Sequence, residues 1–320
     1  MPIWVSLPSA EQIKLSELLF SIVIACYNQE GFVRQAVESA LSQEHPSKEI
    51  IVVDDGSRDG TADVLNTFGE SIILARLPIN RGAVAARNHG ASLASGEYLV
   101  FLDGDDVLMS RALEVYGRLV TARCPKIIFG RSAKCYGKVP EVKTADLPCD
   151  IQFVEYANFL AKDRPCVFNT STLVVDRSTF WSAGGWSPGI FYQDIQDLVT
   201  KLGVSGKMIL VLAPDTVWYR MHLTNAVNKV SPFIEGIHVL LAKARAGLYP
   251  GGRERWVERS AWFGGLIFYW TKTAMRAGLY RDGFILLASG WWMILFAVIR
   301  RGTAWLVGRK PIEILPLEHD

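Results

Sequence analysis

The segment FSIVIACYNQEGFVRQAVESALSQ at residues 20–43 decides the fold class. It begins with an apolar, β-branched run, Phe20–Ala25, and continues with apolar residues at helical spacing over residues 31–43. Downstream, the same alternation continues with strand candidates at Glu49–Val53, Ile72–Leu77 and Tyr98–Leu102 and helical segments at residues 60–68 and 83–94. Strands this apolar, joined by helices, are typical of a mostly parallel sheet covered on both faces. The pattern therefore predicts an α/β fold.

The second half of the chain is less regular and then becomes helical. A helix is expected near residues 110–122, strands at Lys126–Gly130 and Ser171–Val175, and a further helix after the second of these. Beyond residue 225, three helices are expected near residues 232–247, 253–277 and 283–301. We therefore divide the chain into an α/β domain, 1–225, and a helical C-terminal extension, 226–320.

Composition supports this division. The 320 residues are 50% apolar, which is enough to fill a sizeable core and excludes a disordered or fibrous protein. Residues 1–225 hold 21 Lys and Arg against 25 Asp and Glu, whereas residues 226–320 hold 13 against 7. Six of the ten Trp also lie in the basic extension. The two regions are expected to have different roles, and no nucleic-acid partner is expected.

The cysteines and the N-terminus indicate a cytoplasmic protein. The five cysteines are odd in number and form no CxxC pair, so neither a disulfide framework nor a zinc site is expected. The N-terminus lacks the basic start and apolar run of a secretory signal.

Two acidic clusters follow two of the predicted strands. They are Asp54-Asp55-Gly56-Ser57 and Asp103-Gly104-Asp105-Asp106. Carboxylates at strand ends repel one another unless a cation or hydrogen-bond donors offset them, and oxygen ligands suit Mg²⁺ or Mn²⁺ beside substrate phosphates. Asp-Gly turns and helix capping are the alternative explanation of either cluster. Because both clusters lie at matching ends of one sheet, we favour a ligand and metal site.

Three segments in register resemble the nucleotide-sugar-binding half of the family 2 glycosyltransferases. They are residues 20–43, 49–61 (EIIVVDDGSRDGT) and 80–106 (NRGAVAARNHGASLASGEYLVFLDGDD), with weaker similarity to about residue 222. The resemblance implies the GT-A, Rossmann-like fold. It also implies an inverting transfer from a nucleotide-diphosphate sugar, with a UDP-sugar favoured. The acceptor would be a hydroxyl of a glycan or a lipid-linked acceptor in polysaccharide or cell-surface glycan synthesis.

The resemblance also implies roles for individual residues. Asp54 or Asp55 would hold the base or ribose, and Asp103 and Asp105 match the family's DxD motif. The nucleotide-sugar-binding residues would be Ala25, Tyr27, Asn28, Glu30, Asp54, Asp55, Arg81, Arg87, Asp103, Gly104 and Arg220. Mn²⁺ or Mg²⁺ would be held by Asp105, Asp103 and His222.

For several of these residues a structural role is the alternative. Arg81 and Arg87 would then form surface salt bridges or caps, and His222 would be a packing residue. Asp106 is expected to cap a helix or to support the motif.

The catalytic base is expected on the acceptor side, at Asp194 in the segment Phe191–Gln196 (FYQDIQ). The family usually shows Glu-Asp here, so Gln193 departs from the pattern and Asp194 keeps it. A carboxylate at this point would accept the proton of the attacking hydroxyl. Asp197 is the alternative base, and helix-dipole stabilisation is the structural alternative for both.

The C-terminal extension leaves three possibilities open. Gly283–Ile299 is 17 residues without a charge, which is at the short limit for a spanning helix. It either packs in the core or a dimer, or contacts a membrane surface, or crosses the membrane. If the extension contacts or crosses a membrane, the protein is expected at the inner face of the cell membrane. Gly252–Trp256 lacks the Gln of the processive Gln-x-x-Arg-Trp motif, so one transfer per encounter is expected.

Other functions compete with the transferase. One is a catalytically idle scaffold that binds a sugar nucleotide or docks on a membrane. Such a scaffold would not need Asp103, Asp105 and Asp194. A metal-dependent nucleotidyltransferase would release pyrophosphate instead of a nucleoside diphosphate. A dinucleotide oxidoreductase is disfavoured, because the loop after Phe20–Ala25 offers no GxGxxG.

Overall fold

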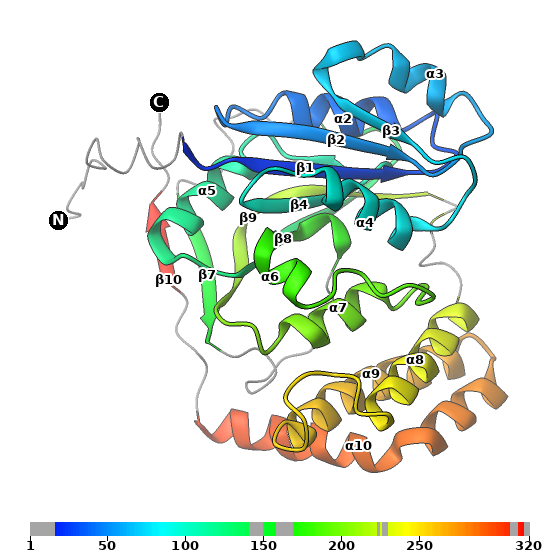
Figure 1. Cartoon of the computed structure of the whole chain (residues 1–320). Helices are drawn as coiled ribbons and strands as arrows, with labels where there is room; N and C mark the ends of the chain where they lie inside the picture. Colours follow the sequence, from blue (N-terminus) through cyan, green and yellow to red (C-terminus); the bar gives the residue numbers. More distant parts are fainter. Residues whose placement is uncertain are drawn as a thin grey trace.

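The computed structural model describes residues 17–140, 150–157, 169–222, 225, 230–307 and 313–316, with side chains to residue 300. Within it, a mixed sheet is covered by helices on both faces, and helices α8, α9 and α10 form a further layer below (Figure 1). The expected α/β fold is confirmed.

The N-terminal half of the sheet is parallel. Its strands are β1 (Phe20–Cys26), β2 (Lys48–Asp54), β3 (Ile73–Arg76) and β4 (Tyr98–Asp103). β1 lies between β2 and β4, and Ala25 pairs with Val53 on one side and Asp103 on the other. This register brings the carboxyl ends of β1, β2 and β4 to the same level, where both acidic clusters begin.

The other half of the sheet is largely antiparallel. Its strands are β5 (Val107–Leu108), β6 (Ile127–Tyr136), β7 (Asp150–Tyr156), β8 (Leu173–Asp176), β9 (Met208–Met221) and β10 (Glu313–Pro316). The order is β10-β7-β9-β6-β8-β4-β1-β2-β3, with β5 paired to β9. β6 and β9 are parallel, whereas β4–β8, β6–β8, β7–β9, β7–β10 and β5–β9 are antiparallel. The parallel strands thus form the half that carries the candidate site.

The helices connect and cover the strands. Those of the sheet domain are α2 (Val33–Leu41), α3 (Thr61–Asn66), α4 (Ala83–Leu93), α5 (Ala112–Arg123), α6 (Arg177–Ser182) and α7 (Asp194–Leu202), with 3₁₀ turns η1 (Gly69–Ser71) and η3 (Thr170–Thr172). The C-terminal helices are α8 (Val230–Arg245), α9 (Trp256–Arg276) and α10 (Tyr280–Val307). The strand and helix positions expected from the periodicity are confirmed to within a few residues, whereas β5, β7, β9 and β10 were not predicted.

Two hydrophobic cores lie on opposite faces of the sheet because successive strand residues point to opposite sides. Ile22 and Ile24 face the core under α2 and α5. Val23 faces the core shared with α4, α7 and the C-terminal helices, which reaches Ile237 of α8 and Phe263 of α9. The C-terminal helices therefore pack into the main core, which is one of the possibilities that the sequence left open for this extension.

Three of the five cysteines lie among the described residues. Cys26, Cys124 and Cys135 are free thiols, and burial raises the pKa of the Cys26 thiol above its ordinary value. Cys149 and Cys166 lie outside the described residues.

Close packing of α4 on the sheet gives a stability prediction. A Cβ at Gly90 would lie 2.4 Å from Cγ1 of the buried Val23 and 3.2 Å from Cγ2 of Val53. Both neighbours are stiff β-branched side chains, so Gly90→Ala should lower the free energy of unfolding by about 1–3 kcal/mol despite the better helix propensity of Ala. Urea denaturation measures this. Gly31→Ala, where nothing lies within 4 Å of the added Cβ, is the control and should change stability far less.

Candidate active site

The guanidinium of Arg87 joins two of the predicted site carboxylates. Its Nη2 lies 2.6 Å from Oδ1 of Asp103 at the end of β4, and its Nη1 lies 2.5 Å from Oδ2 of Asp194 at the start of α7. Arg87 is 6% exposed, so its charge is almost removed from water and needs these partners. Burial alone would lower the pKa of Arg87, but the two carboxylates outweigh it and raise that pKa. Residues 107 positions apart are thereby held in one charged cluster.

Trp186 supports this cluster from the side. Its ring lies 5.1 Å from the Arg87 guanidinium, in cation–π contact. Its backbone N–H donates to Oδ1 of Asn88 at 3.0 Å, and its carbonyl accepts from Nδ2 of the same residue at 2.8 Å. Asn88 follows Arg87 on α4, so this loop is fixed to the helix that carries the cation. The sequence analysis missed Asn88 and Trp186, and the Gly184–Gly185 break before the Trp was the available signal.

Asp194 and Asp197 lie in different surroundings. The Asp194 side chain is 16% exposed and faces Arg87. Asp197 is fully buried, and its Oδ1 lies 2.5 Å from Nζ of Lys243 and 2.7 Å from the hydroxyl of Tyr249. The geometry favours Asp194 over Asp197 as the group that could meet an acceptor.

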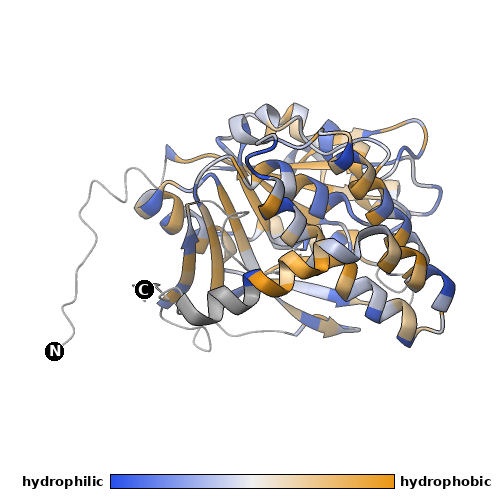
Figure 2. Ribbon diagram, turned by 90° about the horizontal axis from the view of Figure 1, so that it is seen from below, coloured by the Kyte–Doolittle hydropathy of each residue, from blue (hydrophilic) through white to orange (hydrophobic). Residues whose placement is uncertain are grey.

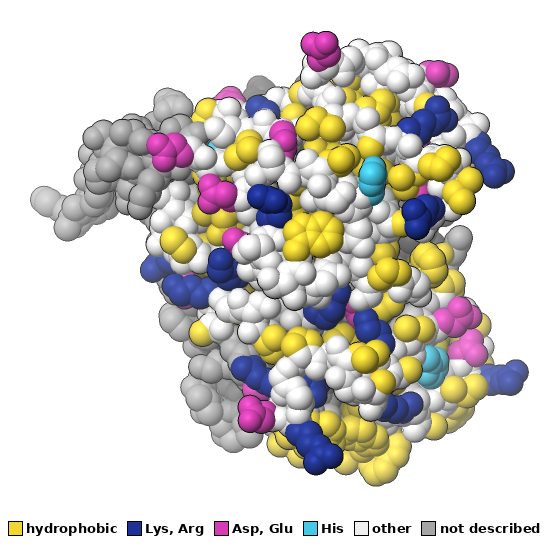
Figure 3. Space-filling model, viewed as in Figure 1, with side chains coloured by type: hydrophobic (Ala, Val, Ile, Leu, Met, Phe, Trp, Pro, Cys, Tyr) yellow, Lys and Arg dark blue, Asp and Glu magenta, His cyan; other side chains and the backbone are white. Residues whose placement is uncertain are grey.

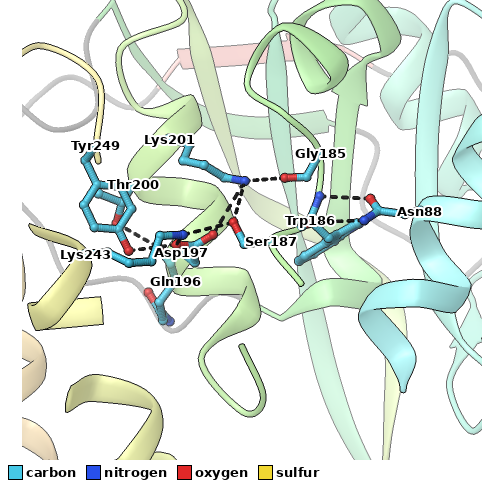
Figure 4. Close-up of polar contacts among 10 residues, drawn as sticks. All are labelled: Asn88, Gly185, Trp186, Ser187, Gln196, Asp197, Thr200, Lys201, Lys243 and Tyr249. Carbon is cyan, nitrogen blue, oxygen red and sulfur yellow. Dashed lines mark hydrogen bonds and ion pairs between the residues drawn. The ribbon is translucent and has the colours of Figure 1, made fainter. Parts of the chain in front are cut away.

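Asp197 instead belongs to a buried polar cluster between α7 and the C-terminal helices (Figure 4). Lys243 also donates to Oγ of Ser187 at 3.0 Å, and so does Lys201, whose Nζ lies 3.6 Å from Oδ2 of Asp197. Lys201 further donates to the carbonyl of Gly185. We call Asp197, Lys201, Lys243, Tyr249 and Ser187 the α7 anchor. It connects α8 both to α7 and to the loop that holds Gly185, Trp186 and Ser187.

Gln193 stands where the family usually has Glu. It is 1% exposed, and its Nε2 donates to the carbonyl of Phe233 on α8 at 3.3 Å. A Cβ at Gly236 would lie 2.7 Å from its Cγ. A neutral amide suits this buried position against a backbone carbonyl better than a carboxylate would.

Asp105 and His222 form a polar pair at the same end of the sheet. Oδ2 of Asp105 lies 3.0 Å from Nε2 of His222, and the imidazole stacks on Phe32 with ring centroids 4.8 Å apart. A carboxylate oxygen and an imidazole nitrogen that approach one another are a donor set that Mn²⁺ accepts. Among the described residues no three His, Cys, Asp or Glu side chains are grouped to hold a metal ion. A cation here would therefore need further ligands from water or from a diphosphate, as is usual for Mg²⁺ sites.

Asp106 and Arg220 tie the DxD loop to β9. Asp106 accepts hydrogen bonds from the Ser171 hydroxyl at 2.5 Å and from the Arg220 backbone N–H at 3.0 Å, and burial raises the pKa of this carboxyl well above its ordinary range. The Arg220 guanidinium donates to the carbonyls of Asp105 and Gly137 and to Oε1 of Gln35. Arg220 thus has protein partners for its guanidinium, and its expected contact with phosphate remains a prediction.

Asp54 and Asp55, at the end of β2, hold the loop after β2 and the loop before α4. Asp55, which is buried, accepts the backbone N–H of Arg81 at 2.9 Å and that of Gly82 at 2.7 Å, so it shapes the loop that starts α4. Asp54 accepts the N–H of Ser57 at 2.9 Å and lies 3.2 Å from Nε of Arg76. Arg76, on β3, was missed because its strand position gave no signal of a site.

A cavity of about 360 Å³ opens beside these residues. It is lined by Gly56, Ser57, Arg58, Arg76, Leu77 and Pro78. The side chain of Arg81 is exposed nearby on the loop that Asp55 holds. The volume lies within the range of small-molecule sites, and two arginines, Arg58 and Arg76, lie in its wall.

The loop after β1 completes the edge. Asn28 adopts a positive φ of 52°, its N–H donates to Oγ of Ser57 at 2.9 Å, and its Oδ1 accepts from the N–H of Arg58 at 2.9 Å. Tyr27 is exposed, and Oε2 of Glu30 accepts the Gly60 N–H at 2.6 Å. The β1 loop is therefore bound to the loop after β2.

Gly104 is required by close approach. Its N–H donates to the carbonyl of Ala25 at 3.0 Å. An added Cβ would lie 2.2 Å from Oε1 of Gln29 and 2.7 Å from Cβ of Cys26. A side chain at this position would push the DxD loop away from the end of β1 and the loop after it, so the glycine is needed for this close approach.

Known proteins match this chain over its sheet domain and beyond. The family model described as glycosyl transferase family 2 matches residues 21–179. Over 226 residues the chain is 30% identical to the Escherichia coli protein WfaP, named UDP-Glc:alpha-D-GlcNAc-diphosphoundecaprenol beta-1,3-glucosyltransferase, covering 69% of this chain and 85% of that relative. The chain belongs to glycosyltransferase family 2 and is a glycosyltransferase.

Solved structures agree on the fold. S. aureus TarS 1–349 in complex with UDP-GlcNAc matches with a TM-score of 0.61 at 14% identity, over 78% of this chain and 71% of that one. The mannosyltransferase PcManGT from Pyrobaculum calidifontis, in complex with GDP-Man and Mn²⁺, matches with a TM-score of 0.55 at 15% identity, over 89% and 86%. Both likenesses support the GT-A type of α/β fold.

The α7 anchor gives a second stability prediction. Lys243→Met keeps the apolar stem but removes the cation nearest the buried Asp197, leaving Lys201 at 3.6 Å and the Tyr249 hydroxyl. Breaking a buried ion pair should lower the free energy of unfolding by about 3 kcal/mol. Urea denaturation tests this, with the exposed Lys272→Met as the matched control. Equal stability of the two variants would contradict the role given to the anchor.

Proposed function

We propose that this chain transfers a sugar from a nucleotide-diphosphate sugar, with a UDP-sugar favoured, to a hydroxyl of a lipid-linked or polysaccharide acceptor, with inversion. The observation that carries the proposal is the Arg87 bridge between Asp103 and Asp194, which puts a donor-side and an acceptor-side carboxylate on one cation. The relatives support the choice of substrates, because WfaP is named for UDP-Glc and a diphosphoundecaprenol acceptor. The TarS structure holds UDP-GlcNAc.

The nucleoside would occupy the cavity between Gly56–Arg58 and Arg76–Pro78. Asp54 and Asp55 hold the two loops that form its walls, and Tyr27 and Arg81 lie exposed at the same edge. The diphosphate would then extend toward Asp103 and Asp105. Residues 1–225 would supply this machinery, and residues 226–320 would support it from the side of α7.

Asp194 would act as the general base. Its Oδ2 is held by Arg87, whereas its Oδ1 has no hydrogen-bond partner among the described residues. Oδ1 would accept the proton of the acceptor hydroxyl as that oxygen bonds to the anomeric carbon and the bond to the diphosphate oxygen breaks. Attack from the face opposite the diphosphate gives inversion.

Asp105 and His222 would hold Mn²⁺ or Mg²⁺, with Asp103 beside them. The bound cation would supply positive charge to the departing diphosphate. With a lipid-linked acceptor, the enzyme would work at the inner, cytoplasmic face of the cell membrane.

Asp194→Asn tests the base. It nearly keeps the shape but cannot accept the proton, so turnover should fall at least about 100-fold while the affinity for UDP stays within about threefold. Turnover is measured as UDP release from UDP-glucose and UDP-GlcNAc in the presence of a GlcNAc-diphosphate-lipid, and affinity by calorimetry. Asp63→Asn, an exposed acid of α3, is the control and should keep full turnover. Near-normal turnover in Asp194→Asn would refute this assignment.

Metal removal tests the donor site. Calorimetry with UDP, GDP, CDP and dTDP, each with Mn²⁺ and then with EDTA, should give metal-dependent binding of one diphosphate, with UDP favoured. Asp105→Ala removes a proposed ligand and should abolish the difference between Mn²⁺ and EDTA. If none of the four diphosphates bound the wild-type chain, the proposed donor class would be wrong.

A further inference from the structure

The outer face of α10 is apolar over about four turns. Its exposed residues between the flanking arginines are Phe284, Ile285, Ala288, Trp291, Leu295, Val298 and Ile299. We call these seven residues the α10 stripe. Phe284, Trp291 and Ile299 are 62%, 58% and 63% exposed, so the stripe is open to solvent in the single chain. Figure 3 shows hydrophobic side chains gathered along the lower edge, with Lys and Arg beside them.

The opposite face of α10 is buried against α9. Leu286 and Met293 belong to the main core, Ala297 is also buried, and a Cβ at Gly264 of α9 would lie 2.0 Å from the carbonyl oxygen of Met293. The helix is kinked at Gly290, where φ is −160° and ψ is 30°, so its two limbs follow the surface of α9. Tyr280–Arg300 is long and apolar enough to cross a membrane, with a mean hydropathy of 1.8. A crossing would strip this packed inner face from the core, whereas contact through the outer face alone would leave it intact.

The ends of the stripe are basic. Arg276 and Arg281 are exposed at the turn from α9 into α10, beside Asp282, and Arg300 closes the other end, followed in sequence by Arg301. Arg300 is also fixed to α9, because its Nη1 donates to the carbonyl of Glu258 at 3.3 Å. Aromatic rings lie next to the stripe as well, where Trp256 stacks on Trp292 with centroids 5.5 Å apart.

We propose that α10 lies in the plane of an anionic membrane surface, with the α10 stripe among the acyl chains and the flanking arginines on lipid phosphates. An apolar face with Trp and Phe, flanked by Arg, is the pattern of helices that bind in the bilayer interface. Figure 2 shows α10 running across the underside of the molecule, with the limb after the kink strongly hydrophobic. The proposal deepens the proposed function, since it names the surface that brings the enzyme to a lipid-linked acceptor.

A second copy of the chain fits the stripe less well. Two stripes packed antiparallel about a twofold axis would bring the arginines at one end of each helix against Arg300 of the other copy. Asp282 is the one acidic residue in the sequence of α10, and Glu258 of α9, near Arg300, already pairs with Arg255 at 2.9 Å. Like charges opposed across an interface disfavour that pairing, whereas anionic headgroups complement every one of these arginines.

Vesicle sedimentation of the full chain tests the proposal. The wild-type chain should sediment with vesicles of phosphatidylglycerol and phosphatidylethanolamine, more weakly with phosphatidylcholine alone, and more weakly at high salt. The double variant Phe284→Ser with Leu295→Ser should weaken binding at least about tenfold, because two large apolar side chains no longer enter the bilayer. The matched control, Ile73→Ser with Leu93→Ser on β3 and α4, replaces two exposed apolar residues elsewhere and should bind like wild type.

Three outcomes would overturn the proposal. The wild type could remain in the supernatant with every vesicle, or the double variant could bind as tightly as wild type. Alternatively, sedimentation equilibrium could show that the wild type is a dimer and the double variant a monomer, which would assign the stripe to a second copy.

UDP binding is measured on the same samples. A variant that binds UDP but not vesicles has lost only the docking surface. A wild type that binds vesicles but no diphosphate would overturn the donor assignment and leave the docking surface standing.

Discussion

The ion pairs of Arg87 are the interaction on which the candidate site depends. A guanidinium that is almost fully buried is stable only if carboxylates compensate it, and here one comes from β4 and the other from α7. Arg87 lies on α4, and Asp55 fixes the loop from which this helix starts. Trp186 covers the guanidinium from the side. The end of β4 and the start of α7, which are the proposed donor and acceptor sides, are therefore placed relative to one another by charge as well as by packing.

The parallel half of the fold was readable from the sequence, whereas in the largely antiparallel half only β6 and β8 were predicted. Phe20–Cys26 and Tyr98–Asp103 are short, uninterrupted apolar runs between helical segments, and such runs have few other interpretations. β9 is 14 residues long with buried, half-buried and polar positions mixed, and its register against its neighbours shifts at bulges. A strand of that kind has no regular period, because different stretches of it face different neighbours.

The candidate site residues that stand close together in the sequence as acidic motifs could be predicted. Those that reach the site only through the folding of distant segments could not. Asp103, Asp105 and Asp194 stand in recognisable acidic motifs, and the structure brings the first and last onto one cation. Trp186 and Arg76 contribute through the direction in which their side chains point, which depends on a loop conformation and on the position of an edge strand. Asp197 illustrates the converse: it has the right residue type and spacing for a base, but its partners are Lys243 and Tyr249.

The α7 anchor bears on how separable the two regions of the chain are. A chain cut after residue 225 would retain every predicted active-site carboxylate, yet Asp197 would lose Lys243 and Tyr249 and remain in an apolar setting beside Lys201 alone. The helix that begins with Asp194 would then carry, one turn further on, a buried charge with Lys201 as its remaining partner. The sheet domain and its C-terminal helices thus depend on one another structurally, and joining either to another partner would require the anchor to be rebuilt at the same time.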